Sequence, residues 1–585
     1  MNDIRRTILW VIFGFSLVML WDQWQVYNGR QATFLPHKPA ATAQAPASAS
    51  ASASASAVSQ TSAVPSPAGN TAAPGAVATT AAAVPGAGAS APQVPRERFT
   101  VTTDVMRITF DTEGGSVVRT EMLEHPAETG TKGSTETFVL LDESAGREYV
   151  AQSGLIGGDF PNHKTIMTAS GERTLKAGAN ELQVKFESPV VGGVKLTKTY
   201  TIKRGAYDMT VTHQVQNAGS APVQPQLYLQ IVRDGKDLPG TSSFYSTFTG
   251  PAVYTEEQKF QKVKFEDIDK NKADIQKESD RGYVAMVQHY FASAWILPDG
   301  TRRELFLRAI PNTSAPQLGS SLYAVGMIDK LAALAPGQAS EVNARFFAGP
   351  ENEKMLEKIE PGLELVKDYG HLTILAKPLY WLLDKLHSFI GNWGWSIVAL
   401  VLLIKIAFYW LQAKGYESMA KMKAINPRVM AMRERYKENP QQMQQEMMRI
   451  YREEKVNPLG GCLPIFIQIP VFISLYWVLL ASVEMRNAPW IGWIHDLSSR
   501  DPYYILPIVM TVTTLFQTAL NPAPPDPMQA KMMWIMPMVF AVMFFYFPAG
   551  LVLYWVTNNI LSIAQQWLIN TRMGVKVEFN LPKFG

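Results

Sequence analysis

The sequence predicts a polytopic α-helical membrane protein that carries a large antiparallel β-sandwich outside the cytoplasm. Residues 96–350 contain short alternating runs such as ELQVKFE and VKLTKTYTI, separated by Gly, Asn, Asp and Pro, which is typical of antiparallel strands. Apolar stretches long enough to cross about 30 Å of hydrocarbon occur near the N-terminus and beyond residue 390. The loops between the later stretches differ strongly in Lys and Arg content, as cytoplasmic and external loops do.

The composition excludes several classes of protein. The 585 residues leave room for several domains, and a net charge of +4 is too small to indicate nucleic-acid binding by itself. The single cysteine, Cys462, excludes an intrachain disulfide and a cysteine-cluster metal site. A catalytic Lys405 would need a serine partner, but Ser396 lies more than two helical turns away. We therefore expect no enzyme, no cofactor and no metal.

The first 95 residues are predicted to form an anchor and a tether. Residues 1–30 contain Arg5, Arg6 and the apolar run TILWVIFGFSLVMLW, without an A-x-A cleavage site. We expect an uncleaved signal anchor with a cytoplasmic N-terminus rather than a signal peptide. Residues 31–95 are dominated by Ala, Ser, Pro, Gly and Thr, which bury too little apolar surface to fold. As a disordered coil they would span roughly 40–50 Å.

Residues 96–350 are predicted to form a periplasmic β-sandwich. Its histidines, among them His163, His213 and His289, are scattered without metal-ligand spacing. A structural role is preferred over a sugar-processing site.

Residues 351–391 are predicted to form an amphipathic helix on the outer membrane surface. Its apolar residues recur at three-residue steps, with lysines beside them. A soluble helix packed on the sandwich is the alternative.

Five further spans are predicted in the C-terminal part. They are residues 392–413, 462–483 and 503–520, and a pair within residues 534–570 divided by the Phe-Pro-Ala-Gly turn at 547–550. Residues 414–461 carry ten Lys and Arg residues, whereas residues 484–502 carry two. The positive-inside rule therefore places 414–461, 521–533, 571–585 and both termini in the cytoplasm and 484–502 in the periplasm.

The basic segment 414–461 is predicted to be a helical hairpin broken at Asn439–Pro440. Its many methionines offer an adaptable surface for varied partners, or else join the two helices together. Its basic side chains are candidates for contact with ribosomal RNA or anionic lipid headgroups. They are Lys414, Lys421, Lys423, Arg428, Arg433, Arg435, Arg449 and Arg452.

Lys405 places one charge within the predicted span 392–413, at a cost on the order of 2.5–3.5 kcal/mol. It should therefore snorkel toward the headgroups or face a hydrated pocket. The last span carries a polar stripe at i, i+4, i+7 and i+11, namely Trp555, Asn559, Ser562 and Gln566, with Tyr554, Asn558 and Gln565 alongside. Other spans add Thr511, Thr514, Thr518, Gln517 and Gln468. These side chains join helices by hydrogen bonds, or form a hydrated groove with Lys405 for the polar flank of a passing chain.

Long motifs carry a family resemblance. KVNPLGGCLPIFIQIPVFISLYWVL, SVEMRNAPWIGWIHDLSSRDPYYILPI, NPAPPDPMQAKMMWIMPMVF and FPAGLVLYWVTNNILSIAQQWLI closely resemble the YidC family of membrane protein insertases, in its six-span Gram-negative form. The resemblance implies five core helices around a hydrophilic groove, and a periplasmic β-supersandwich similar to galactose mutarotases but without their activity. It also implies a chaperone that inserts newly made inner-membrane proteins, alone or beside the Sec translocon (SecYEG and SecDF), and receives chains from the ribosome.

The resemblance also suggests the groove residues. The family's groove charge is usually an arginine, and Lys405 aligns with it here, without the forked donor geometry of a guanidinium. Val401 and Trp555 match substrate-contacting positions of the family. The expected groove comprises Lys405, Val401, Gln468, Thr511, Thr514, Gln517, Tyr554, Trp555, Asn558, Asn559, Ser562 and Gln566. The alternatives are a translocon-associated scaffold without autonomous insertion and a secondary transporter, although no inverted repeat is evident.

Overall fold

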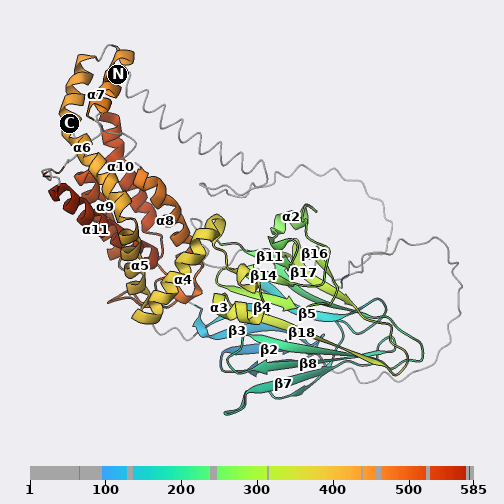
Figure 1. The fold of residues 1–585 in the computed structure, drawn as a ribbon. Coiled ribbons are helices and arrows are strands. Elements are labelled where there is room, and N and C mark those ends of the chain that lie inside the picture. The colour runs from blue at the N-terminus through green and yellow to red at the C-terminus, as the bar shows by residue number, and fades with distance from the viewer. Residues whose placement is uncertain are drawn as a thin grey trace, which may run out of the picture.

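The computed structural model describes residues 95–127, 136–236, 247–312, 315–436, 439–454, 463–521 and 527–572, with residues 65, 574 and 579. The predicted anchor and nearly all of the predicted tether lie outside these residues. The described chain forms a β-sandwich and a helical part, which lie side by side in Figure 1.

Two nine-stranded antiparallel sheets form the sandwich, which confirms the predicted sandwich. The first sheet, in spatial order, contains β1 (Arg98–Thr102), β2 (Met106–Asp111), β3 (Ser116–Pro126), β4 (Thr137–Ser144), β5 (Arg147–Ile156), β10 (Gln226–Asp234), β17 (Ser321–Lys330), β16 (Arg303–Pro311) and β13 (Glu278–Ser279). The second contains β12 (Lys259–Lys262), β11 (Gly250–Thr255), β14 (Tyr283–Gln288), β15 (Phe291–Ile296), β18 (Ala339–Pro350), β9 (Asp208–Asn217), β8 (Val194–Lys203), β7 (Glu181–Glu187) and β6 (Thr168–Gly171).

The strands follow from their side-chain alternation. In β7, Leu182, Val184 and Phe186 are buried while the residues between them are exposed, so one face of the strand covers the core. The central strands β14 and β15 are buried along their whole length. Trp295 in β15 joins the two sheets, because its indole Nε1 donates to the carbonyl oxygen of Gln230 across 3.1 Å.

The segment after the sandwich is not one continuous helix. It divides into α3 (Glu353–Ile359), two 3₁₀ turns (Leu363–Val366 and Gly370–Leu372) and α4 (Thr373–Ile390). The breaks fall where Glu360 is extended and where Gly362 and Gly370 adopt positive φ angles of 91° and 66°. The apolar residues at three-residue spacing therefore pack in two different cores. Leu363 and Val366 lie in the core of the sandwich, and Tyr369 lies in the core of the helical part.

The helical part consists of seven further α-helices among the described residues. They are α5 (Trp393–Ala407), α6 (Tyr409–Arg435), α7 (Pro440–Glu453), α8 (Leu463–Ala481), α9 (Ile505–Leu520), α10 (Pro527–Phe544) and α11 (Ala549–Arg572). A 3₁₀ turn, Val483–Met485, follows α8. The short helix α2 (Phe265–Asp269) and the 3₁₀ turn Pro316–Leu318 belong to the sandwich.

Within the described ranges, no individual helix combines the length and the apolarity that crossing a membrane requires. One bent pair of helical segments, Trp393–Ala407 and Tyr409–Met419, meets that requirement jointly, with a bend of 69° between them. Shorter apolar helical segments are Gln468–Ala481, Ile505–Leu520 and Ala530–Phe544. The number of spans and the domain boundaries derived from the sequence stay predictions.

Two charged residues after α8 attach the helical part to the sandwich and its following segment. The Glu484 carboxylate accepts hydrogen bonds from Tyr380 Oη at 2.7 Å, Asn352 Nδ2 at 3.1 Å and Lys367 Nζ at 3.3 Å. Because Lys367 is buried, this ion pair is shielded from solvent screening.

Arg486 makes the second attachment. Its guanidinium donates to the carbonyl oxygens of Pro126 at 3.0 Å and Ala127 at 3.3 Å, at the end of β3. It also lies 5.3 to 5.9 Å from the ring centroids of three aromatic residues of the sandwich, which are Phe138, Tyr290 and Phe291. These contacts combine cation–π attraction with charge-assisted hydrogen bonds.

Candidate functional site

A cavity of about 430 Å³, which includes space open to its surroundings, lies between α5, α6, α8 and α11. Its lining residues are Val401, Ile404, Lys405, Phe408, Leu411, Gln412, Gln468, Val471, Tyr554 and Asn558. The wall therefore combines five apolar side chains with one ammonium group, three amides and one phenol.

Lys405 points inward rather than along the helix surface. Lys405 is only 7% exposed, and its Nζ donates a hydrogen bond to Ser562 Oγ at 2.7 Å. A longer contact of 3.5 Å joins Nζ to Gln412 Oε1. Ser562 in turn donates to the carbonyl oxygen of Asn558 at 2.7 Å, so it presents its lone pairs to the ammonium.

The bend between α5 and α6 brings Gln412 to Lys405. Residues seven positions apart lie on one face of a straight helix, but about 10 Å apart along its axis. Helix α5 ends at Ala407, Phe408 leaves the helical conformation, and α6 departs at 69°. This change of direction shortens the separation and lets both polar side chains face the same cavity.

A second polar contact crosses the cavity from α8 to α11. Gln468 Nε2 donates to Asn558 Oδ1 at 2.8 Å, and both residues line the cavity. Val401 and Tyr554, also in the lining, are buried. Five of the twelve groove residues expected from the sequence are thus in the lining, and Ser562 is bonded to one of them.

Other predicted groove residues lie between α11 and α9 instead. Asn559 Nδ2 donates to Thr514 Oγ1 at 2.8 Å and Thr513 Oγ1 at 3.2 Å. Gln566 Nε2 donates to Asn521 Oδ1 at 3.2 Å near the end of α9. These contacts are interhelical hydrogen bonds of the kind that hold membrane helices together.

The remaining three predicted residues also lie outside the cavity lining. Thr511 Oγ1 donates to the carbonyl oxygen of Pro507 within α9 at 2.8 Å. Gln517 is half-buried in α9. Trp555 packs on Phe472 and Phe544, with ring centroids 4.4 and 5.1 Å apart.

The expected groove omitted one polar residue that lines the cavity, Gln412. Gln412 lies seven residues after Lys405, a spacing that places two residues on one face of a helix and could have identified it. Gln565, which the sequence places beside the polar stripe of the last span, lies outside the cavity lining and is 8% exposed, with no hydrogen-bond partner for Nε2 or Oε1 among the described residues.

The loop after α8 closes the helical part on the side of the sandwich. Gly394 allows the Trp490 ring to pack on α5, because a Cβ there would lie 2.2 Å from Trp490 Cδ1. Asn392 Nδ2 donates to the carbonyl oxygen of Pro489 at 3.0 Å, and the Gly550 amide at the start of α11 donates to that of Leu497 at 2.8 Å. The loop is thus fixed to both α5 and α11.

Helices α6 and α7 form a hairpin with a small core of its own. Val429, Met432 and Ile450 are buried there, and Met443 and Met447 pack against them. Met430 and Met448 are exposed instead. Methionines therefore both join the helices and supply an exposed apolar surface.

The basic residues of the hairpin lie on its helices, mostly in exposed positions. Arg428 bridges the helices through ion pairs to Glu453 at 3.0 Å and Glu454 at 2.6 Å. Lys421 pairs with Glu417, Arg449 pairs with Glu446 and Glu453, and Lys414 lies over the Trp410 ring. Arg433, Arg435 and Arg452 also lie in the hairpin, as does Lys423, whose side chain is outside the described part.

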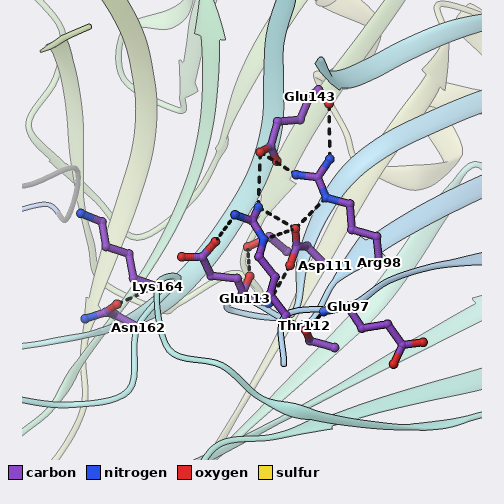
Figure 2. Close-up of polar contacts among 10 residues, drawn as sticks. Glu97, Arg98, Asp111, Thr112, Glu113, Glu143, Asn162 and Lys164 are labelled. Carbon is purple, nitrogen blue, oxygen red and sulfur yellow. Dashed lines mark hydrogen bonds and ion pairs between the residues drawn. The ribbon is translucent and has the colours of Figure 1, made fainter. Parts of the chain in front are cut away.

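An ion cluster at the start of the sandwich is the other concentration of charge, and Figure 2 shows it. Arg96 and Arg98 reach the buried carboxylate of Asp111 at 2.7 and 2.8 Å, and they also pair with Glu143. Burial would raise the pKa of Asp111, but hydrogen bonds from Arg96, from the Glu113 backbone amide and from Arg98 lower the pKa overall. These paired charges hold β1 against β2 and offer no free group for chemistry.

In the ranges that the structure covers, no group of three or more His, Cys, Asp or Glu residues has the geometry to hold a metal ion.

Comparison with known proteins identifies the family. Residues 98–382 match the model of the YidC periplasmic domain, and residues 385–576 match that of the 60Kd inner membrane protein. Proteins named membrane protein insertase YidC from Cupriavidus necator and Ralstonia nicotianae are 56% and 54% identical to the chain, with 98% of each chain covered. One with the same name from Burkholderia multivorans is 52% identical, covering 98% of this chain and 99% of the relative.

The two matched regions are a periplasmic domain and an inner-membrane part that follows it. Proteins of this class are membrane protein insertases and not enzymes. The chain belongs to the YidC family of membrane protein insertases.

The similarity to solved structures is low. A crystal structure of active YidC insertase is 19% identical with a TM-score of 0.37, and covers 80% of this chain and 92% of that one. A putative aldose 1-epimerase from Escherichia coli K12 is 10% identical with a TM-score of 0.27, and covers 44% and 100%. Both TM-scores are under 0.5, so neither likeness supports a functional conclusion.

Proposed function

We propose that this chain inserts newly made inner-membrane proteins by admitting their polar segments to the cavity beside Lys405. The observation that carries the proposal is a buried ammonium group in a cavity whose walls also offer amides. The shared name of the relatives supports it and does not favour a scaffold or a transporter.

The proposed mechanism is thermodynamic. A polar flank that leaves water loses hydrogen bonds, and Lys405, Gln412 and Asn558 replace part of them. The ammonium attracts acidic flanks, and the low dielectric of the surroundings strengthens that attraction. Burial of the client's apolar span in lipid, worth about 25 cal/mol per Å², then drives its release.

The topology that we propose has six membrane spans. The first lies within residues 1–30, and the other five, beginning with residues 392–413, form the core. The sandwich lies in the periplasm and both termini in the cytoplasm. The charge difference between the loops 414–461 and 484–502 supports this arrangement. Ile374 and Phe389, which are 90% and 88% exposed on α4, support a position of that helix on the outer membrane surface.

The partners that we propose are nascent membrane proteins, membrane lipids, the ribosome and the Sec translocon with SecYEG and SecDF. The α6–α7 hairpin supports contact with anionic surfaces, because basic residues such as Arg435 and Arg452 are exposed on it. The exposed methionines Met430 and Met448 suit contact with apolar segments of varied shape.

Reconstitution tests the proposal. The purified protein in liposomes receives a single-span client with an acidic translocated end, and protease protection of that end is scored. Lys405→Ala should reduce insertion by about tenfold, the loss expected for one hydrogen bond to a charged group. Lys405→Arg should retain insertion because the charge remains, and Lys531→Ala, which removes an exposed lysine of α10, is the matched control.

The outcomes separate the parts of the proposal. Equal insertion by all variants would keep the insertase but remove the groove charge from its mechanism. No insertion by the wild type above protein-free liposomes, despite correct folding, would exclude autonomous insertion and favour a translocon-bound chaperone.

A further inference from the structure

Arg486 contacts neutral groups where the helical part meets the sandwich. Its guanidinium lies 5.3 to 5.9 Å from the ring centroids of Phe138, Tyr290 and Phe291. Its hydrogen bonds go to two main-chain carbonyl oxygens, and Nη1 has no hydrogen-bond partner among the described residues. We call this contact the Arg486 joint. It holds a positive charge with rings and carbonyl dipoles, which are weaker partners for a cation than a carboxylate.

Two histidines lie at the same joint. His125, near the end of β3, packs edge-on against Phe291, with ring centroids 5.4 Å apart and an angle of 83° between the planes. His289, in the turn between β14 and β15, has its ring centroid 3.7 Å from that of Tyr290. Each histidine therefore shares an aromatic neighbour with Arg486.

The acidic neighbours of His125 are already engaged. Glu484 attracts a positive charge on His125, but its carboxylate accepts a hydrogen bond from the buried ammonium of Lys367 at 3.3 Å. Tyr207, whose ring centroid lies 6.4 Å from that of His125, donates from Oη to Glu124 at 3.2 Å. Burial and the guanidinium outweigh the attraction of Glu484 and lower the pKa of His125 from 6.5 to about 4.

His289 has a neutral hydrogen-bond partner, because its Nδ1 lies 2.6 Å from Thr247 Oγ1. Burial and, to a smaller extent, Arg486 lower the pKa of His289 from 6.5 to about 4. Asp496 attracts the guanidinium, but it also accepts hydrogen bonds from two serines of its own loop. Both histidines are therefore neutral at pH 7 and become cationic in acid.

We propose that the Arg486 joint is acid-sensitive, and that protonation of His125 and His289 beside the guanidinium weakens the docking of the sandwich on the helical part. Each protonated ring adds a positive charge to a partly buried contact, where charges are poorly screened. Undocking moves the guanidinium away, so the histidines then bind protons more readily. Docking is strongest above pH 6.5 and weakens as the pH falls toward 4. On the topology that we propose, the joint faces the periplasm and responds to the pH outside the cytoplasm.

A cysteine placed between the two parts measures the docking. Val483, in the 3₁₀ turn after α8, is 4% exposed and belongs to the core of the sandwich. In the full-length Val483→Cys protein with Cys462→Ser, the thiol should react with dithiodipyridine only in undocked molecules, so the labelling rate follows the undocked fraction. Rates are measured from pH 7 to pH 4.5 and divided by the rate at the exposed Lys185→Cys, which removes the pH dependence of the thiol itself.

The corrected rate at Val483→Cys should rise by about tenfold between pH 7 and pH 4.5. Two histidines whose pKa values are each about 1 lower in the docked state would give this factor. His125→Phe keeps a ring against Phe291, and His289→Asn keeps a partner for Thr247. The two substitutions together should remove most of the rise, with little change in the rate at pH 7.

Three controls separate repulsion from other effects of acid. Arg486→Met should raise the rate at pH 7 but reduce its further rise in acid, because the repelling charge is gone. His495→Gln, which removes an exposed histidine of the same loop, should keep the full rise. A thiol at Val184→Cys, where the native side chain is 1% exposed in β7, reports unfolding of the sandwich itself and should be labelled no faster at pH 4.5 after the same correction.

Three results would overturn the proposal. The first is a corrected rate at Val483→Cys that does not change with pH, and the second is a full rise in the double histidine variant. The third is a parallel rise at Val184→Cys, because acid would then unfold the sandwich rather than release it.

Discussion

His213 is a fully buried histidine of β9 whose ring nitrogen Nε2 lies 2.9 Å from Ser153 Oγ in β5. Burial and, to a smaller extent, the nearby Lys198 lower its pKa from 6.5 to about 3. The folded state therefore holds His213 neutral, while the unfolded state binds a proton below its ordinary pKa. Stability contributed by this residue is present above pH 6.5 and is lost as the pH falls toward 3.

A pH titration of unfolding checks this prediction. The free energy of unfolding of the sandwich should decrease between pH 6.5 and pH 3, by up to about 5 kcal/mol for this residue at about 1.4 kcal/mol per pKa unit. His213→Gln should make the free energy of unfolding less dependent on pH between pH 6.5 and pH 3, whatever its effect on stability at neutral pH. His495→Gln removes an exposed histidine and is the control. An unchanged slope in His213→Gln would contradict the assignment.

The candidate site shows what single residues reveal in sequence. Lys405 is conspicuous because a charge in an apolar run needs a reason, and the structure places it in the cavity wall. The polar face of α11 was harder to assign. Trp555–Asn559–Gln566 and Tyr554–Asn558–Gln565 are rows of equal regularity one residue apart. Only the positions of the other helices decide that Tyr554 and Asn558 line the cavity, whereas Asn559 and Gln566 contact α9 and the residue after it.

At the scale of elements, the α6–α7 hairpin depends on a small core. Met432 in α6 is 8% exposed and packs with Val429 and Ile450, whereas Met430, two residues earlier, is 49% exposed. Truncating a buried methionine in a core usually costs about 2–5 kcal/mol, and this core has few other contacts to compensate. Met432→Ala should therefore unfold the hairpin locally.

Amide hydrogen exchange along α6 and α7 measures the effect. Met432→Ala should accelerate exchange throughout α7, while Met430→Ala, the matched control, should leave it close to that of the wild type. Equal acceleration by both substitutions would indicate that helix propensity, rather than the small core, holds the hairpin together.

Elements also mark a limit of the sequence prediction. Alternation identified the strands because each strand has one buried face, as β7 shows. The apolar steps from Leu363 to Leu375 predicted one amphipathic helix, but Gly362 and Gly370 divide the segment. Periodicity counts apolar positions without revealing which core each one joins, so Leu363 and Tyr369 looked alike and pack in different cores.

At the scale of the whole molecule, Arg486 attaches the helical part directly to the sandwich. Arg486→Met keeps an apolar chain among the aromatic rings but removes the donors to Pro126 and Ala127. Loss of these charge-assisted hydrogen bonds leaves two carbonyl oxygens without a partner. The docking of the sandwich on the helical part should therefore be weakened by about 2–3 kcal/mol. No local pattern predicts this contact, because its partners lie far apart in the chain.

Distances between spin labels measure the loosening. Labels at Lys185→Cys in β7 and Arg500→Cys in the loop before α9, with Cys462→Ser, should give a narrow distance distribution in the wild-type background. Arg486→Met should broaden it, and Arg302→Met, which removes an exposed arginine of the sandwich, should not. A narrow distribution in both would show that Glu484 and its partners suffice for docking.

The same contact fixes an order of events during synthesis. Pro126 and Arg486 are 360 positions apart, and the last strand of the sandwich ends at Pro350. A ribosome adds about 5–20 residues per second, so Arg486 is synthesised on the order of ten seconds after the last strand of the sandwich. During synthesis there is therefore a stage at which all strands of the sandwich have been made but the helices to which it docks have not.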